Sequence, residues 1–216
     1  MCGRFTLRTP LSVLMQEFEL QVPLDFPVFD RYNIPPTVQI PVIRRLETQR
    51  TMSLMRWGLL PSWTNDPKKS PLLNNARAET VAEKPSFRSA YKNRRCIIPA
   101  SGFFEWLTEG KSKQPYLFRH PDDRPLAFAG LWEKWGELES CTIITTEANE
   151  VMAPIHDRMP VILGRNDYSR WLDTSADVDG LLTPCPPDEL ICYPVDPVVN
   201  NARNEGPQCI MPLNSK

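Results

Sequence analysis

The sequence is poor in the residues that usually bind metals. It has only two histidines, and none of its six cysteines forms a C-x-x-C pair. The nearest pair, Cys185 and Cys192, has no histidine at the spacing of a zinc finger. Structural zinc sites need four cysteine or histidine ligands at short, regular spacings. We therefore expect no metal site, and a metal protein built on the six cysteines is the weakest interpretation.

Long apolar runs are also missing. No stretch approaches the roughly eighteen apolar residues of a membrane helix. The first thirty residues contain no basic segment followed by a long apolar run, so no secretory signal is expected. We predict a cytoplasmic protein with reduced thiols and no contact with a membrane. Cys96 and Cys141, each followed closely by two isoleucines, are expected in the core.

An overall excess of basic charge is absent, since the net charge is −1. The charges are nevertheless unevenly distributed. Residues 1–100 hold 15 Lys and Arg against 8 Asp and Glu, whereas residues 101–216 hold 10 against 18. This asymmetry indicates an electropositive face directed at an anion such as nucleic acid, unless the two halves interleave in the fold and their charges mix.

Proline is abundant, with 23 scattered residues, and indicates short elements joined by rigid turns. Thr9 and Pro10 are expected to start an amphipathic helix that ends near residue 20. Further helices are expected at 147–152 and 166–172. Strands are expected to outnumber them, at 38–44, 51–57, 96–99, 103–107, 116–119, 126–131, 141–145, 160–163 and 190–193. The pattern predicts one α+β domain over 1–216, a compact and mainly antiparallel sheet closed or folded on itself, with a few peripheral helices.

The second residue has an unusual chemical potential. If Met1 is removed, Cys2 carries a free α-amine and a thiol on adjacent carbons, a combination that no internal cysteine offers. Arg4 places a cation two residues away, and a nearby cation favours the thiolate. The N-terminal residue is therefore a candidate nucleophile.

Glu105 and His156 are candidates for proton transfer. Glu105 lies in the strand-like segment Gly-Phe-Phe-Glu-Trp, where Phe103 and Glu105 share one face and Phe104 and Trp106 the other. It is either a solvent-facing acid or an acid in a partly dry cleft with a raised pKa. His156 has an acid and an arginine beside it, which suits general acid–base work, although a lone histidine is often structural. His120 is expected in an exposed turn without a function.

Two further segments have the composition of a binding surface. Asn74, Asn75 and Arg77 follow a long loop and could orient a polar substrate and hold a phosphate, or form an ordinary turn and helix start. Trp57 and Trp63 flank Gly-Leu-Leu-Pro-Ser. Exposed aromatic residues in a basic context stack on unpaired bases, whereas burial is the commoner role of a single tryptophan.

Six motifs occur in a fixed order: Met-Cys-Gly-Arg-Phe at 1–5, Arg-Tyr-Asn-Ile-Pro-Pro at 31–36, Trp-Gly-Leu-Leu-Pro-Ser-Trp at 57–63, Asn-Ala-Arg-Ala-Glu-Thr at 75–80, Gly-Phe-Phe-Glu-Trp at 102–106 and His-Asp-Arg-Met-Pro at 156–160. Together they strongly resemble the SOS-response-associated peptidase (SRAP) domain family. The resemblance implies a barrel-like, mainly β fold with a positively charged cleft. It also implies that the protein binds abasic sites in single-stranded DNA and crosslinks to them through a thiazolidine ring, without a cofactor.

The resemblance further implies roles for four residues. Cys2 would be the nucleophile, Asn75 would orient the sugar or the imine, and Glu105 would move protons near the amine. His156 would assist opening of the sugar and reversal of the crosslink. Such chemistry is lyase-like, and removal of Met1 could be autocatalytic.

Five other residues match positions expected to contact DNA. The phosphate contacts would be Arg4, Arg77 and Arg158, while Pro36 and Trp63 would line the kinked strand and separate its bases. The assignment of Asn75 rather than Asn74 rests on the match to the family motif. The segment after Trp63 lacks a second aromatic residue found in other members, and 173–189 matches nothing.

Two alternatives remain open at this point. One is a thiol hydrolase or peptidase that uses Cys2, Glu105 and His156. The other is a non-catalytic single-strand binder, in which Cys2 would be dispensable. We expect a monomer in either case.

Overall fold

The computed structural model describes residues 2–23, 26–110 and 112–213. Its strands are mostly antiparallel and form two sheets. Five strands of the larger sheet close into a barrel in the order β5-β4-β7-β10-β11, because β11 also pairs in parallel with β5 through Ser140–Arg56 and Cys141–Trp57. The barrel strands are β4 (Gln39–Leu46), β5 (Gln49–Trp57), β7 (Arg95–Ala100), β10 (Leu126–Trp135) and β11 (Leu138–Glu147). The short strands β2 (Leu20–Gln21), β6 (Asn75–Arg77) and β12 (Arg158–Pro160) extend this sheet.

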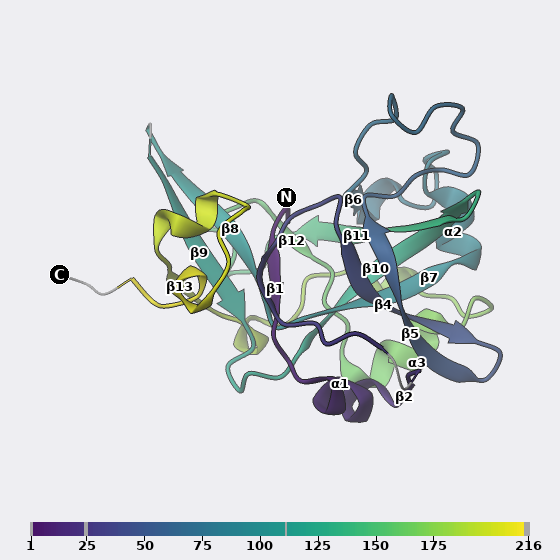
Figure 1. Cartoon of the computed structure of the whole chain (residues 1–216), viewed down its shortest axis with the longest axis horizontal. Coiled ribbons are helices and arrows are strands. Elements are labelled where there is room, and N and C mark those ends of the chain that lie inside the picture. Colours follow the sequence, from purple (N-terminus) through teal and green to yellow (C-terminus); the bar gives the residue numbers. More distant parts are fainter. Residues whose placement is uncertain (1, 24–25, 111, 214–216) are drawn as a thin grey trace.

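The smaller sheet lies beside the barrel and carries the N-terminus on one of its inner strands (Figure 1). Its order is β13-β9-β8-β1-β3. The strands are β1 (Phe5–Leu7), β3 (Arg31–Ile34), β8 (Gly102–Glu109), β9 (Ser112–Arg119) and β13 (Ile191–Pro194). The predicted α+β class with a closed, mainly antiparallel sheet is confirmed.

The α-helices in the described chain are short and peripheral: α1 (Leu11–Phe18), α2 (Arg88–Asn93) and α3 (Tyr168–Leu172). The expected helices at 10–20 and 166–172 are confirmed as α1 and α3. Thr9 does not cap α1, because its hydroxyl lies 2.9 Å from that of Ser101. The helix expected at 147–152 is wrong: β11 runs to Glu147, and the Asn149 side chain then accepts the backbone N–H of Met152 and fixes a turn. No helix among the described residues has the length and apolar composition of a membrane span.

The main core lies between the barrel and the smaller sheet, and aromatic rings join the two. Phe5 on β1 contacts Trp57 on β5 and Phe128 on β10, with ring centroids 5.2 and 6.2 Å apart. Phe103 on β8 stacks on Phe118 of β9 at 5.0 Å. Aromatic pairs in such geometries add stability beyond the area they bury, so the two sheets hold each other at a fixed distance. Cys96 and Cys141 are buried in this core as predicted.

The two faces of β8 belong to different cores. Phe103 packs into the main core, whereas Phe104 packs into a second, smaller one with Val195, Val199 and Cys209. The segment 195–210, shown in yellow in Figure 1, covers this second face. The alternation predicted for 103–107 is therefore correct, and it places Glu105 on the side of β8 that faces the barrel.

Candidate active site

Cys2 lies at the junction of the two sheets. It is fully buried and leads directly into β1, which pairs with β8 through Phe5 and Phe103. The Asn75 side chain donates from Nδ2 to the Cys2 carbonyl at 2.8 Å. Asn75 begins β6, which runs parallel to β11 of the barrel. The N-terminal segment is thus held from both sheets at once.

The structure distinguishes between the two neighbouring asparagines. Asn74 takes part through its backbone carbonyl, which accepts from the Trp57 indole at 2.9 Å and from the Ile143 amide at 3.1 Å. Asn75, the asparagine that the motif match assigns to the site, is the one whose side chain contacts Cys2. Trp57 is fully buried and its indole donates to the Asn74 carbonyl, so it is a core residue rather than a stacking surface.

Glu105 is buried, at 3% exposure, on the face of β8 toward Cys2 and His156. Burial raises the pKa of its carboxyl. Of the two interpretations of this residue, an acid in a partly dry cleft is therefore correct.

Burial also raises the pKa of the Cys2 thiol, and the charge of Glu105 raises it further. A hydrogen bond from the backbone of Arg4 lowers this pKa slightly, but burial dominates. The prediction that Arg4 favours the thiolate is therefore wrong, because a desolvated thiolate beside a carboxylate is disfavoured.

His156 lies in the loop between β11 and β12. Its Nδ1 is 3.0 Å from the Arg158 backbone nitrogen and 3.0 Å from the Asp157 carboxylate. His156 and Glu105 line one open pocket of about 470 Å³. The remaining lining residues are Trp106, Thr108, Lys113 and Asn200. Asn75 contacts Cys2, Cys2 interacts electrostatically with Glu105, and Glu105 shares a pocket with His156, so the four predicted residues form one connected group.

His120 was expected to be exposed, but the structure shows that it is buried. It lies at the end of β9, where the Asp122 amide donates to its Nδ1 at 3.0 Å and the Arg124 guanidinium contacts its Nε2. The turn that the sequence indicates is present, but it folds back over the ring. Burial lowers the pKa of His120, and Arg124 lowers it further.

Two of the predicted phosphate contacts already have protein partners. Arg158 donates to both oxygens of Glu79 and to the Thr145 carbonyl at 2.6 Å, and these hydrogen bonds hold the pKa of Glu79 below its usual range. Arg4 donates to Asn33 at 2.7 Å and to the Val199 carbonyl at 3.0 Å. A phosphate at Arg158 would compete with Glu79.

The other predicted DNA contacts are more accessible. Arg77 is exposed at the end of β6, and Trp63 is 63% exposed on the loop between β5 and β6. Pro36 is half-buried in the turn after β3. That turn is rigid, because Thr37 adopts a φ of 77° and donates its amide to the Trp57 carbonyl at 2.7 Å.

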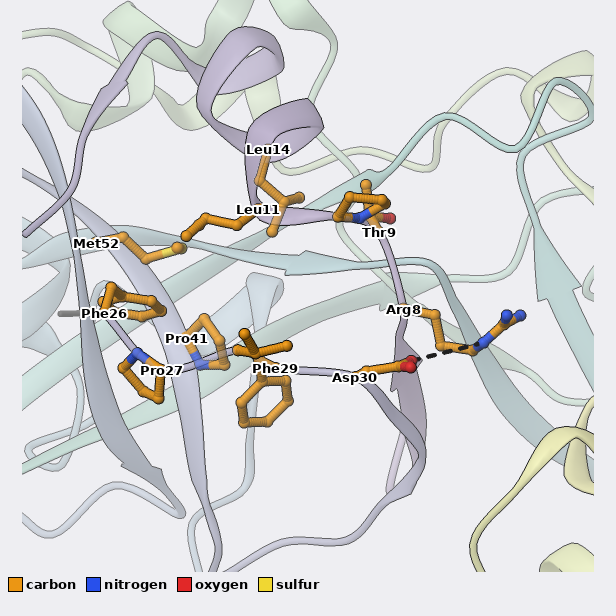
Figure 2. Close-up of a pocket in the computed structure, with 12 residues that line it drawn as sticks. Arg8, Thr9, Leu11, Leu14, Phe26, Pro27, Phe29, Asp30, Pro41 and Met52 are labelled. Carbon is orange, nitrogen blue, oxygen red and sulfur yellow. Dashed lines mark ion pairs between the residues drawn. The ribbon is translucent and has the colours of Figure 1, made fainter. Parts of the chain in front are cut away.

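A second cavity of about 300 Å³ lies between α1 and residues 26–30 (Figure 2). It is largely apolar, with Leu11, Phe26 and Met52 among its lining residues and an ion pair between Arg8 and Asp30 at its edge. It contains none of the predicted site residues. Among the described residues no cluster of three His, Cys, Asp or Glu side chains could hold a metal, and the six cysteines are free.

Sequence reasoning did not identify three residues that line the pocket of Glu105 and His156, namely Trp106, Lys113 and Asn200. Trp106 lies in the motif Gly-Phe-Phe-Glu-Trp, whereas Asn200 lies in none of the six motifs. Lys113 carries no local signal. The pairing of β8 with β9 and the packing of 195–210 against β8 bring these residues to the pocket. No short motif predicts either of these contacts.

Comparison with known proteins gives a consistent result. The family described as SOS response associated peptidase (SRAP) matches residues 1–202. The chain is 40% identical to the abasic site processing protein YoqW of Bacillus subtilis, with 97% of this chain and 99% of the relative covered. It is 30% identical to the abasic site processing protein YedK of Escherichia coli, covering 99% and 100%. It is also 36% identical to the abasic site processing protein HMCES of Xenopus tropicalis, covering 83% and 65%.

Solved structures agree with these sequence relatives. A crystal structure of a Bacteroides thetaiotaomicron protein superimposes with a TM-score of 0.87 at 25% identity and covers 99% of this chain and all of the other. A Bordetella bronchiseptica protein gives 0.78 at 28% identity, covering 90% and 100%. The fold and the sequence motifs thus match over nearly the whole length. The chain therefore belongs to the SOS response associated peptidase (SRAP) family.

Proposed function

We propose that this protein processes abasic sites in single-stranded DNA by forming a covalent crosslink through Cys2 after Met1 has been removed. The observation that carries the proposal is the position of Cys2, which Asn75 holds and which lies close enough to Glu105 for an electrostatic interaction. Glu105 in turn lines one pocket with His156. Relatives that share nearly the full length are named abasic site processing proteins, which supports the substrate class.

The chemistry balances without a co-reactant. The Cys2 α-amine adds to the aldehyde carbon of the ring-opened abasic sugar and gives a carbinolamine. Loss of one water gives an imine. The thiol then adds across the C=N bond, with sulfur bonding to carbon and the proton going to nitrogen. The product is a five-membered thiazolidine, and the net loss is one water.

The protonation states support an attack by the amine first. An α-amine has a pKa near 8, so a neutral fraction exists at neutral pH. The Cys2 thiol has a raised pKa and stays protonated until the imine forms. An N-terminal thiol hydrolase would instead need a ready thiolate. Condensation through the amine can therefore begin while the thiol is still protonated.

Each neighbouring group has a task in this scheme. Glu105, with its raised pKa, would deliver the proton that leaves with water from the carbinolamine. His156, on the same pocket, would assist opening of the sugar ring to the aldehyde. Asn75 would fix Cys2 so that amine and thiol meet the same carbon.

Intact mass spectrometry tests the proposal. The untagged protein is measured before and after incubation with a single strand that carries one abasic site. We expect a starting mass without Met1 and then an adduct equal to protein plus oligonucleotide minus one water. A strand with a tetrahydrofuran analogue, which has no aldehyde, is the control. Retained Met1, or no adduct after its removal, would contradict the mechanism. Multiple turnover on a peptide would support the hydrolase.

A further inference from the structure

One wall of the active-site pocket has no role in the condensation. It consists of Trp106 and Thr108 on β8, Lys113 on β9 and Asn200 on the segment 195–210. Thr108 and Lys113 are cross-strand partners in the β8–β9 hairpin. Both are exposed, so their polar groups face solvent at the pocket rather than the core. We refer to these four residues as the hairpin wall.

The chemistry of the hairpin wall is dominated by hydrogen-bond donors. The Trp106 indole donates to Asn200 Oδ1 at 2.6 Å. This bond occupies the amide oxygen and turns the Asn200 N–H₂ group away from the indole. Lys113 adds an ammonium with three donors and no acceptor, and Thr108 adds a hydroxyl.

The hairpin wall is also held in place. Arg4 lies over the Trp106 ring, with its guanidinium carbon 5.9 Å from the centroid, and donates to the carbonyl of Val199, the residue before Asn200. Asn33 is fully buried and donates to the carbonyls of Val199, Asn201 and Asn204 at 2.9–3.2 Å. These contacts fix the backbone on both sides of Asn200.

We propose that the hairpin wall binds a backbone phosphate of the DNA strand whose lesion lies at Cys2, with Lys113 supplying the charge and Asn200 an oriented N–H donor. This inference rests on the proposed function. A phosphate offers only acceptors and carries one negative charge, which matches a surface of donors with one cation. The acid that lines the pocket, Glu105, is only 3% exposed, so it lies behind the solvent-facing donors of the hairpin wall. A second acid near the pocket, Asp157, is exposed, lies 3.0 Å from His156 and is not among the residues that line the pocket.

Salt-dependent binding measures the contact of Lys113. We would follow the fluorescence anisotropy of a labelled single strand with a tetrahydrofuran analogue, which binds without reacting, at several salt concentrations. Each phosphate contact to a single strand contributes about 0.7 to the slope of log affinity against log salt. We expect Lys113→Gln to reduce that slope by about 0.7 and to weaken binding about three- to tenfold at low salt. Lys92→Gln, an exposed lysine on α2, is the matched control and should change neither.

Asn200→Asp tests the oriented donor. The aspartate retains an oxygen for the Trp106 indole but replaces the N–H₂ group with a second oxygen. We expect a loss of affinity of about tenfold or more, because the new charge faces the phosphate. Asn201→Asp introduces the same charge one residue away. The Asn201 side-chain oxygen accepts a hydrogen bond from the Arg203 amide at 3.0 Å, and an aspartate oxygen can accept the same bond. It should weaken binding at most twofold.

The outcomes separate this inference from the proposed function. If the wild type binds and crosslinks the strand but Lys113→Gln leaves the salt slope unchanged, the hairpin wall does not contact phosphate. Equal affinities of Asn200→Asp and Asn201→Asp would refute the role of Asn200. A wild type that does not bind single strands would overturn both proposals. Lys113 is exposed, so its variant remains decisive even if Asn200→Asp fails to fold.

Discussion

Glu105 shows how one buried residue connects stability with chemistry. A carboxyl that is almost inaccessible to water holds its proton at a pH at which the same group in the unfolded chain is ionised. The folded state then binds more protons than the unfolded state. Stability therefore falls as the pH rises from the usual pKa of a glutamate toward the raised pKa of Glu105.

Glu105→Gln should remove this pH dependence. We expect the variant to gain stability relative to wild type as the pH increases from 4 to 8, by about 1.4 kcal/mol for each tenfold difference in proton affinity between the two states. The adduct should form about 100-fold more slowly, because the proton donor is lost. Thermal melts at both pH values and a time course of adduct formation check the two effects. An equal difference in melting temperature at both pH values would contradict the burial argument.

Asn75 offers a second test at the scale of a residue. Asn75→Ala removes the hydrogen bond to the Cys2 carbonyl, so the amine and the thiol lose their fixed position. We expect adduct formation to slow about 10- to 100-fold, with little change in melting temperature. Asn74→Ala is the matched control, because Asn74 acts through its backbone carbonyl, and it should stay within a factor of two. Equal rates for the two variants would show that the Cys2 contact is not used.

At the scale of elements, β3 acts as the anchor for the C-terminal segment. Arg31 pairs with Glu205 at 2.6 Å, and the Tyr32 amide donates to the same carboxylate at 2.9 Å. Asn33 is buried and binds the Arg4 guanidinium as well as the carbonyls of the segment. A single short strand thus connects the first residues of the chain to 199–205.

Asn33→Ala should loosen this connection and spare the barrel. The change leaves buried carbonyls and part of the Arg4 guanidinium without their partner, at a cost of about 3 kcal/mol. We expect amide hydrogen exchange to increase in 195–210 and to stay unchanged in β7 and β10. Asn93→Ala removes a single exposed bond to the Ser89 carbonyl in α2 and serves as the control. Uniform exchange changes across the chain would indicate global unfolding rather than a local anchor.

Local patterns predict the elements well where side chains alternate or where a proline starts a helix, as in β8 and α1. They fail where a side chain overrides propensity, as when Asn149 turns the chain after β11 and the expected helix at 147–152 does not form. They also miss β6, because a strand of three residues that pairs in parallel with β11 has no local signature. The catalytic candidates were found through ordered motifs. Lys113 was not identified from the sequence, because it reaches the pocket only through the pairing of β8 with β9.

At the scale of the whole molecule, closure of the barrel brings distant segments together. The pairing of β5 with β11 joins residues 56–57 to 140–141, and no short pattern encodes it. The uneven charge of the two halves is a property of the same scale. It becomes an electropositive surface only if the basic residues of the first hundred gather around the active-site pocket.

Cys2→Ala separates binding from capture. The variant lacks the thiol, so we expect no thiazolidine, yet the phosphate contacts remain and non-covalent binding to a single strand should stay within about threefold of wild type.

If Arg77 contacts a phosphate, adding Arg77→Gln should reduce the salt slope by about 0.7. Arg45→Gln, near the tip of the β4–β5 hairpin and 3.9 Å from Asp173, should leave the slope unchanged. Anisotropy titrations between low and high salt measure all three. A slope that responds equally to both arginines would mean that overall charge, rather than a located surface, attracts the strand. If the affinity of every variant stays constant as the salt concentration rises, a phosphate-lined surface is excluded.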